Sequence, residues 1–523
     1  MARVIVSTAH RRRATTAVVW GATLLGLALR LYQLSRPGFL LGVTEYDDGA
    51  YFGSALRLVH GVLPYRDFVL VQPPGITLLM APVALLAGGI GTAKALAVGR
   101  VLTVCAGAGG IAVGGSLVRH RGPLAATITC GIIAVHPDAV ASAHTVLLEP
   151  WLVLCCLLGL RLVFDGDSLV REVAGWRSRA VWGGIAFGAA GAIKVWAILP
   201  VIVVAALWLP VCRRFLSGVA LGFAVPVLPF VVLAPRRFVD SVIVGQLSRV
   251  DATRVPLWTR LASLAGVPPV AAALAIALVV LAIRRRPTAL EWFAMVTAAL
   301  VVGAFCWPDD YYYHYAGFFA PFLALAIALP VTATAQWRLT GIVAVAIALA
   351  AAGQARTETG LRAADPAAIA QRLIPPGACV LTDEVSLTIA ADRFTSAVPG
   401  CSPMVDGVGT DYALSLGRNG ITGAGAVPAV QSTWLSAFEH AGYVWLSSAA
   451  DRRIPWTPAI TGYFTHHFTA VPAPALTGRL YVRSRLRGGR QPPASHSMAS
   501  AEGIEPSGRG FEDRAAFQSP PTR

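Results

Sequence analysis

The sequence is poor in charged residues, and very few of those it has are lysine. Asp, Glu, Lys and Arg together make up 13% of the 523 residues, whereas a soluble globular chain carries about 25%. Hydrophobic residues make up 55%, and the mean hydropathy is +0.63. This composition excludes a water-soluble enzyme over most of the length and predicts a polytopic membrane protein.

Lys94 and Lys194 are the only lysines, so the net charge of +16 comes from arginine. Most of the arginines stand in short clusters between apolar runs, where membrane proteins carry their cytoplasmic anchors. We therefore expect the partner of this positive charge to be a lipid bilayer, and we expect no nucleic acid partner.

Several cysteine and glycine motifs are missing from the chain. The eight cysteines show no CxxC spacing, so no zinc site is indicated. There is no Walker-type G-x-x-x-x-G-K-[ST] and no dinucleotide-binding fingerprint, as expected of a chain that uses no nucleotide. Cys379 and Cys401 lie outside the apolar runs and could pair in an oxidising compartment.

The apolar runs predict about 11 membrane spans, and at most 13, since a spanning helix needs about 20 mostly apolar residues. The candidate spans are residues 14–34, 97–117, 123–137, 144–163, 180–193, 195–210, 216–234, 263–283, 289–306, 316–335 and 339–354. Some are short, and residues 180–210 could form one long helix.

The arginine clusters predict the orientation of these spans in the cell membrane. With a cytoplasmic N-terminus, the clusters that follow all fall on the inner side: Arg119 with Arg121, Arg161 to Arg179, Arg213 with Arg214, Arg284 to Arg286, and Arg338. This requires that the run Gly75–Ile90 does not cross, since a crossing would turn the clusters from 119 to 179 outward. We expect a juxtamembrane or half-inserted helix there, on the outer face.

The predicted fold is therefore a polytopic all-α membrane domain followed by a small external α/β domain. The membrane domain covers residues 1–355, with residues 35–96 as an external acidic loop that carries juxtamembrane helices. Residues 356–484 are more polar and contain strand-like runs at 378–382, 442–447 and 479–483. Residues 485–523 are rich in Arg, Ser, Gly and Pro without periodicity, which predicts a disordered tail.

Three carboxylates stand together in the external loop, at the start of a helix-like stretch. Glu45, Asp47 and Asp48 precede residues 49–60. A carboxylate at a helix N-terminus is stabilised by the free amides and the helix dipole, and one acid would suffice for that role. Three acids repel one another, which favours a catalytic use such as a general base with a partner.

The same loop resembles the first external loop of the GT-C glycosyltransferases. The likeness lies in Asp47-Asp48-x-x-Tyr51, Gly61, Pro64-Tyr65-Arg66-Asp67-Phe68 and Pro73-Pro74-Gly75. It is closest to the family 39-like group, which includes protein O-mannosyltransferases and lipid A aminoarabinose transferases. It extends over residues 1 to about 355, and the C-terminal domain carries no motif of the group.

The resemblance implies that Asp47 is the catalytic base and that Asp48 is the second acid of the pair. Asp47 would deprotonate an acceptor hydroxyl, which attacks the anomeric carbon of a polyprenyl-phosphate sugar with inversion. Two positions depart from the group: Asp48 replaces the commoner Glu, and Gln72 precedes Pro73 where some relatives carry Lys. Glu45, Tyr51 and Gln72 are candidate substrate-binding residues.

A lipid phosphate leaving group calls for a cation at the outer interface, and Lys194 is the main candidate. It stands in G-A-I-K-V-W between two apolar runs, at a depth where a free ammonium is costly. Snorkelling to the interface is the alternative. Arg100 and Arg254 are further candidates for the donor phosphate, although anchoring or a surface role would suit them equally.

Polar residues near two later outer turns complete the candidate site. His144 and Glu149 flank the start of one span, and Glu149 is expected to hold Lys194 or a sugar hydroxyl. Tyr312 and His314 lie in the segment 307–315, which could equally be an interfacial aromatic belt. Oligosaccharyltransferases bind a divalent metal from a comparable loop, but family 39-like enzymes generally do without one, so we expect no cofactor.

These features predict a membrane glycosyltransferase, a hexosyl- or pentosyltransferase whose envelope acceptor is a glycan, a lipid or a protein. Frequent Ala and Arg with scarce Lys is typical of GC-rich bacteria such as actinobacteria, in which mannose or arabinose from decaprenyl phosphate would be natural donors. Two alternatives remain: a lipid or solute transporter or flippase, and a non-catalytic GT-C-like assembly partner. The acids cluster in loops and the halves of the chain do not repeat, which disfavours a transporter.

Overall fold

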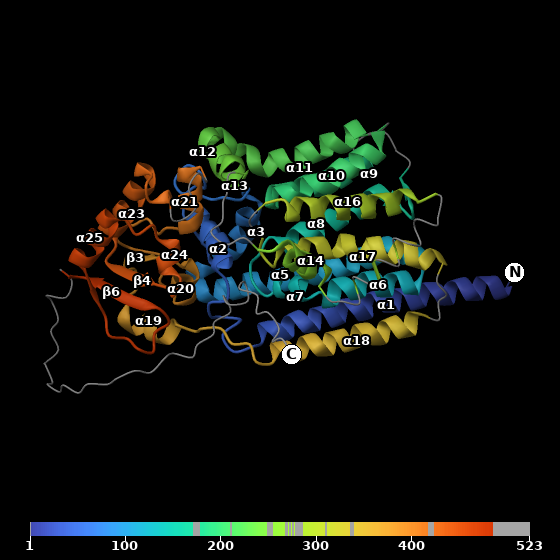
Figure 1. Cartoon of the computed structure of the whole chain (residues 1–523), viewed down its shortest axis with the longest axis horizontal. Coiled ribbons are helices and arrows are strands. Elements are labelled where there is room, and N and C mark those ends of the chain that lie inside the picture. The colour runs from blue at the N-terminus through green and yellow to red at the C-terminus, as the bar shows by residue number, and fades with distance from the viewer. Residues whose placement is uncertain are drawn as a thin grey trace.

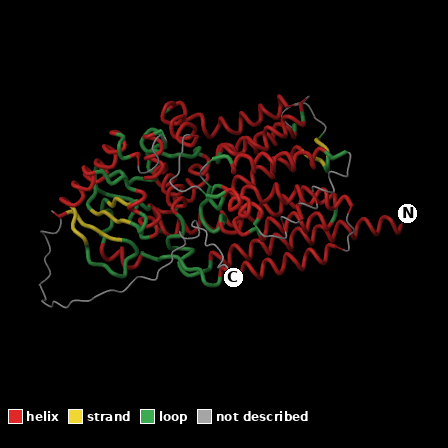
Figure 2. Tube along the Cα trace, in the orientation of Figure 1, coloured by secondary structure: helices red, strands yellow, loops and turns green. Residues whose placement is uncertain are grey.

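The computed structural model describes residues 2–484, apart from 171–177, 210–211, 248–254, 267–269, 271–272, 275–276, 278–285, 309–310, 335–338 and 417–422. The longer part of the molecule is a bundle of helices, and the C-terminal part is a smaller domain that contains a sheet (Figures 1 and 2). The sheet domain lies at one end of the bundle, and the N-terminus lies at the other.

The helices of the bundle coincide with the predicted spans. They are α1 (Ala2–Leu34), α5 (Thr92–Val118), α6 (Pro123–Val135), α8 (Glu149–Val163), α9 (Arg179–Ile193), α10 (Ile198–Leu207), α11 (Cys212–Leu233), α16 (Ala289–Cys306), α17 (Tyr315–Thr334) and α18 (Leu339–Glu358). Among the described residues, 6 helices are long and apolar enough to cross a membrane. The predicted span 263–283 lies mostly outside the described residues, so the total number of spans stays a prediction.

Residues 180–210 do not form one long helix. Helix α9 ends at Ile193, Lys194 is extended with φ −152° and ψ 134°, and the short helix η2 (Val195–Ala197) leads into α10. The break places a lysine with non-helical backbone between two apolar helices.

The run 75–90 forms two short helices, α3 (Gly75–Leu85) and α4 (Ala87–Ile90). An 11-residue helix such as α3 is about 16 Å long, roughly half the thickness of a bilayer core. Helix α3 packs against α2 (Tyr46–Val59), α5 and α9 at the end of the bundle that faces the sheet domain (Figure 1). The short length agrees with a segment that does not cross.

Two of the arginine clusters, those of Arg11 and Arg121, meet at the opposite end of the bundle. Arg11 Nη2 donates to the carbonyl oxygen of Arg121 at 2.9 Å, and Arg121 pairs with Asp167 at 2.8 Å. Asp167 lies in the turn between β1 (Phe164–Asp165) and β2 (Ser168–Leu169), a hairpin that Figure 2 shows far from the main sheet. The clusters of Arg11 and Arg121 therefore lie at the end of the bundle opposite the acidic loop, and the orientation of the bundle in the membrane stays a prediction.

Helices α9 and α11 pack closely through glycines spaced four residues apart, Gly184 and Gly188 on α9, and Gly218 and Gly222 on α11. A Cβ added at Gly188 would lie 2.2 Å from the carbonyl oxygen of Val219, and one added at Gly222 would lie 2.3 Å from that of Ile185. Such small residues let the backbones of membrane helices approach each other.

Replacement of Gly222 by leucine is expected to lower the free energy of unfolding by about 1–3 kcal/mol or more. The new side chain would clash with backbone atoms, which cannot move aside as a flexible side chain can. The thermal midpoint of the detergent-solubilised protein measures this loss. Gly303→Leu on α16 is the matched control, since an added Cβ there meets no heavy atom within 4 Å. Equal midpoints for the two variants would contradict the packing argument.

The C-terminal domain has a four-stranded sheet with strand order β3-β4-β6-β5. Strands β3 (Val380–Thr382), β4 (Tyr443–Leu446) and β6 (Arg479–Arg483) fall within the predicted runs, whereas β5 (Phe468–Ala470) was not predicted. Strand β3 is parallel to β4, and the other neighbours are antiparallel. The helices around the sheet are α19 (Ala367–Leu373), α20 (Val385–Ala390), α21 (Gly407–Ser415), α23 (Pro428–His440), α24 (Ala450–Arg453) and α25 (Pro458–His467). A disulfide joins Cys379 to Cys401.

Short helices cover the end of the bundle between the two parts. They are α7 (Pro137–Ala141), α12 (Pro235–Val239), η4 (Asp240–Val244), α13 (Gly245–Leu247) and α14 (Leu257–Ala265). Helix α21 of the sheet domain packs on η4 and α13, and α20 packs on α2 and α5. The sheet domain is thus seated directly on the acidic loop.

Candidate active site

Asp48 is fully buried in the first turn of α2, and protein partners surround its carboxylate. Arg100 of α5 donates to Oδ2 from Nη2 at 2.7 Å and from Nε at 3.0 Å. Thr145 also donates to Oδ2, and Ser386 Oγ lies 3.1 Å from Oδ1. A carboxylate held in this way fixes the loop and is poorly placed to reach a substrate.

The guanidinium of Arg100 is likewise bound entirely by protein groups. Its side chain is fully buried, and Nη1 donates to the carbonyl oxygens of Phe39 at 2.7 Å and of Leu40 at 3.0 Å. With Nη2 and Nε bound to Asp48, every nitrogen of the guanidinium has a protein acceptor. This geometry favours a positioning role for Arg100 and Asp48 over the predicted phosphate-binding and catalytic roles.

Asp47, the neighbour of Asp48, is half-buried and lightly held. Tyr51 donates to its Oδ2 at 3.4 Å from one turn further along α2. Within the described part of the chain, no cation forms an ion pair with Asp47. The loop therefore presents one available carboxylate beside one that is fixed.

Glu45, the third acid, is held by a tyrosine of the distant segment before α17. Tyr313 donates its hydroxyl proton to Glu45 Oε1. Burial raises the pKa of Glu45 to about 8, and the charges of Asp47, Asp48 and Glu384 add to this rise. Glu45 is thus largely protonated at neutral pH, which leaves Asp47 as the available anion of the loop.

The raised pKa of Glu45 predicts a pH dependence of stability. The fold favours the neutral carboxyl, so the stability from this group is complete below the ordinary pKa near 4.5 and is lost as pH rises through about 8. Each unit of pKa shift corresponds to about 1.4 kcal/mol of unfolding free energy. Glu45→Gln is expected to remove this pH dependence of stability. The thermal midpoint of the variant relative to that of the wild type should therefore rise between pH 5 and pH 9. A constant difference between the two proteins over this range would contradict the prediction.

Lys194 lies in a second cluster, with Glu149 and His314. Its Nζ lies 2.7 Å from Glu149 Oε1, and His314 Nδ1 lies 2.9 Å from the same oxygen. The ammonium also lies 3.5 Å from the centre of the Trp196 ring and 5.0 Å from that of Tyr315, in the range of cation–π contacts. The contact expected between Glu149 and Lys194 is present, and an ammonium and an imidazole converge on one buried carboxylate oxygen.

Three consecutive residues before and at the start of α17 connect the acidic loop with the Lys194 cluster. Tyr313 contacts Glu45, His314 contacts Glu149, and the ring of Tyr315 faces Lys194. The charges of Asp47 and then Glu149 also add to the burial that raises the pKa of Tyr51. The available carboxylate and the cationic cluster therefore belong to one site.

The Pro-Pro-Gly motif lies against the helix break that carries Lys194. Gly75 begins α3, and a Cβ there would lie 2.4 Å from the carbonyl oxygen of Ala192 and 2.8 Å from the amide nitrogen of Ile193. Only glycine allows this approach without a shift of the backbone. The backbone carbonyl of Gln72 accepts a hydrogen bond from Tyr65 at 2.5 Å. This bond within the loop stabilises the turn that precedes the motif.

The remaining predicted residues are placed as follows. His144 is fully buried, with its ring 5.1 Å from that of Phe39, behind the loop. Tyr312 stacks on His314, with 5.7 Å between the ring centres. Arg254 lies outside the described residues. Tyr313 lies in the predicted segment 307–315 but was not itself named. Thr145 and Ser386 were not predicted, because nothing in their local sequence marks them as partners of the acidic loop.

A metal ion would need a different set of side chains. No group of three or more His, Cys, Asp or Glu residues that could hold one occurs in the described ranges. The oxygens of Asp48 are bound by Arg100 and hydroxyl groups, and Glu149 Oε1 is shared by Lys194 and His314. These residues do not fit a metal centre.

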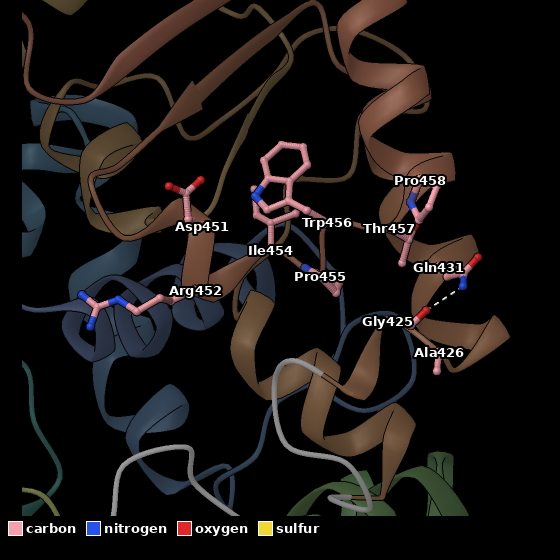
Figure 3. Close-up of a pocket in the computed structure, with 10 residues that line it drawn as sticks. All are labelled: Gly425, Ala426, Gln431, Asp451, Arg452, Ile454, Pro455, Trp456, Thr457 and Pro458. Carbon is pink, nitrogen blue, oxygen red and sulfur yellow. Dashed lines mark hydrogen bonds between the residues drawn. The ribbon is translucent and has the colours of Figure 1, made fainter.

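A separate pocket of about 510 Å³ opens on the sheet domain (Figure 3). It is lined by Trp456, Arg452, Asp451 and Gln431 among others, and Gln431 donates to the carbonyl oxygen of Gly425 at 2.6 Å. The pocket shares no lining residue with the acidic loop or the Lys194 cluster, so it is not part of the candidate active site.

The fold is similar to those of two solved membrane proteins, ArnT and AglB, in agreement with the resemblance seen in the first external loop. ArnT from Cupriavidus metallidurans bound to undecaprenyl phosphate is similar over 90% of this chain and 97% of that chain, with a TM-score of 0.58 and 16% identity. The oligosaccharyltransferase AglB from Archaeoglobus fulgidus with an inhibitory peptide and dolichol-phosphate is similar over 90% of this chain and 74% of that chain, with a TM-score of 0.52 and 14% identity. At these identities the likeness establishes the fold.

No model of a known protein family matches the sequence, and no curated protein matches it either. The AglB protein has also been crystallised with zinc and sulfate, with a TM-score of 0.52 to this chain and 13% identity. That metal belongs to a neighbour of the same fold, and it does not alter the donor set described above.

Proposed function

We propose that this chain is an inverting membrane glycosyltransferase. It moves a hexose or pentose from a polyprenyl-phosphate donor to a hydroxyl of an envelope acceptor, a glycan, a lipid or a protein. The acidic loop and the sheet domain face the outside of the cell membrane, and the arginine-rich end faces the cytoplasm. Undecaprenyl phosphate and dolichol-phosphate, bound to the two structural neighbours, are lipids of this class.

The proposal rests on the half-buried Asp47 carboxylate, which lies in one site with a buried lysine and a histidine. In the reaction, the acceptor oxygen forms a bond to the anomeric carbon from the face opposite the phosphate. The bond between the anomeric carbon and the phosphate oxygen breaks, and its electron pair leaves with the polyprenyl phosphate. The acceptor proton passes to Asp47, which acts as general base.

The other residues of the site hold Asp47 in position or neutralise the charge of the phosphate. Arg100 and Asp48 fix the helix turn that carries Asp47. Lys194 supplies positive charge for the departing phosphate, with His314 as a further donor from the same cluster. Glu149 holds both in place while no phosphate is bound. The motif residue Gly75 allows α3 to seat against the helix break, so the loop and Lys194 keep their relative placement.

The test is a transfer assay with the purified chain in lipid nanodiscs. A panel of hexoses and pentoses on undecaprenyl and decaprenyl phosphate serves as donors, and a whole envelope fraction that keeps its lipids serves as the acceptor. We expect release of free polyprenyl phosphate with at least one donor, together with a glycoside of inverted anomeric configuration.

Two outcomes would count against the proposal. A retained anomeric configuration would exclude a single displacement with Asp47 as base. In proteoliposomes, movement of the intact donor between leaflets without release of polyprenyl phosphate would identify a flippase.

A further inference from the structure

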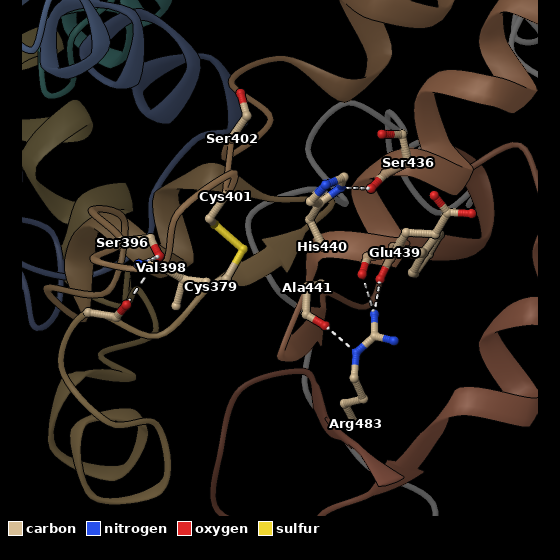
Figure 4. Close-up of a disulfide and its surroundings, with 12 residues drawn as sticks. Cys379, Ser396, Val398, Cys401, Ser402, Ser436, Glu439, His440, Ala441 and Arg483 are labelled. Atoms are coloured by element: carbon tan, nitrogen blue, oxygen red, sulfur yellow. Dashed lines mark hydrogen bonds between the residues drawn. A yellow bond between two sulfur atoms is a disulfide. The ribbon is translucent and has the colours of Figure 1, made fainter. Parts of the chain in front are cut away.

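A covalently closed segment of the sheet domain reaches the acidic loop, beside a second contact in which the Tyr46 hydroxyl donates to Asp406 Oδ1 at 2.8 Å. The disulfide between Cys379 and Cys401 closes a loop with a sequence separation of 22 (Figure 4). Cys379 stands just before β3, and the closed loop contains β3 and α20. This closed segment, residues 379–401, includes the part of the sheet domain that packs on α2 and α5.

Ser386 of the closed segment contacts the acidic loop directly. Its Oγ lies 2.6 Å from the carbonyl oxygen of Glu45 and 3.1 Å from Asp48 Oδ1, so its single proton is shared between two acceptors. The residue is fully buried. Among the described residues, Ser386 is the only hydrogen-bond donor to Asp48 Oδ1, whereas Oδ2 has Arg100 and Thr145.

A glycine in α2 allows Ser386 to approach this closely. Gly49 follows Asp48, and a Cβ there would lie 2.4 Å from both the amide nitrogen and Oγ of Ser386, and 2.9 Å from its Cα. No other residue type fits at position 49 while Ser386 keeps its place. A glycine immediately after the acidic pair thus permits the sheet domain to approach the two carboxylates.

The closed segment also holds the helix that carries Arg100. Asp392 Oδ1 accepts from the amide of Ala93 at 2.9 Å in the first turn of α5, and Thr92 Oγ1 donates to the carbonyl oxygen of Ile389 at 2.7 Å. A carboxylate at a helix N-terminus satisfies free amides and is favoured by the dipole. The segment therefore braces both sides of the Asp48–Arg100 pair.

We infer that Ser386 is a positioning residue for the acidic pair, and that the sheet domain completes the active site through it. Ser386 fixes Asp48 Oδ1 and the Glu45 carbonyl, which sets the direction in which Asp47 projects. Its effect on catalysis rests on the proposed function, whereas its effect on the geometry of the loop does not.

The test compares Ser386→Ala with Ser402→Ala in the full-length protein. Ser402 also links the two parts, since Arg57 of α2 donates to its Oγ at 2.7 Å, but it has no described contact with Glu45, Asp47 or Asp48. Hydrogen exchange of the peptide 44–52 reports the loop without any substrate. We expect about threefold or more faster exchange in S386A, and no change in S402A.

Turnover of the best donor of the panel tests the second half of the inference. We expect kcat to fall by about 10- to 100-fold in S386A, as for a base displaced by about 1 Å, with the donor KM close to wild type and S402A unaffected. The thermal midpoint of S386A should fall, because the buried Asp48 Oδ1 loses its hydrogen-bond donor. Unchanged exchange in S386A would overturn the inference, and so would equal losses in the two variants. Faster exchange with unchanged kcat would overturn the role of Ser386 in the reaction. A wild type without turnover would refute the proposed function, and the exchange data would still decide whether Ser386 positions the loop.

Discussion

Asp47→Asn is expected to reduce the transfer rate by about 10²- to 10⁴-fold, the usual contribution of a general base. Asparagine has the same shape as aspartate but cannot take the acceptor proton. Release of polyprenyl phosphate by the purified variant, measured at saturating donor, gives the change in kcat directly. The donor KM is expected to stay near the wild-type value, because Asp47 acts on the acceptor and not on the phosphate.

The fold should tolerate this substitution. Asp47 is half-buried, and its described polar contact is the hydroxyl of Tyr51 at 3.4 Å, which an amide oxygen can also accept. We therefore expect the same yield and thermal midpoint as for the wild type. Its neighbour Asp48 behaves differently, since Asp48→Asn would leave the fully buried Arg100 without its counter-charge.

The matched control is Asp365→Asn, an exposed aspartate whose Oδ1 accepts from the amide of Ala367 at 3.2 Å. It makes the same chemical change away from the site and should leave transfer unaltered. Wild-type transfer by the Asp47→Asn variant would remove the general base from the mechanism and favour a non-catalytic assembly role. Loss of transfer in both variants would indicate a general effect of the substitution.

The sequence was sufficient to predict most of the helices, because a spanning helix is encoded in its own run of apolar residues. The candidate spans 180–193 and 195–210 already separate at Lys194, but the sequence left one long helix open as the alternative. The runs on each side, G-A-A-G-A-I and V-W-A-I-L-P, are apolar and lack a local stop signal. Strand β5, with three residues, is too short to carry an alternating pattern of its own.

The candidate site was predictable only where its residues are neighbours in sequence. The acidic loop was found because three carboxylates stand within four positions. The partners of these acids come from segments that are 97 positions away for Thr145 and 338 for Ser386, where a single hydroxyl gives no signal. Arg100 was expected to bind phosphate because its charge is evident in the sequence. Its pairing with Asp48, 52 positions earlier, is not.

Lys194→Met is expected to weaken binding of undecaprenyl phosphate by at least about 30-fold, which corresponds to about 2 kcal/mol for the loss of a charge partner. Transfer should fall with it, because the departing phosphate loses its nearest cation. The substitution has a second effect, since it removes a counter-charge from Glu149, which is 1% exposed. Breaking a buried pair on one side costs about 3–5 kcal/mol, so the thermal midpoint should fall as well.

A double variant separates the two effects of this lysine. Glu149→Gln with Lys194→Met removes both charges, and the amide oxygen introduced at position 149 could still accept from His314 Nδ1, which lies 2.9 Å from the native carboxylate oxygen. We expect the thermal midpoint to return toward that of the wild type, while binding of undecaprenyl phosphate and transfer remain low. Recovery of binding and transfer in the double variant would mean that Lys194 serves only to neutralise Glu149. In that case the cation that meets the phosphate must be sought elsewhere, with His314 as the nearest candidate.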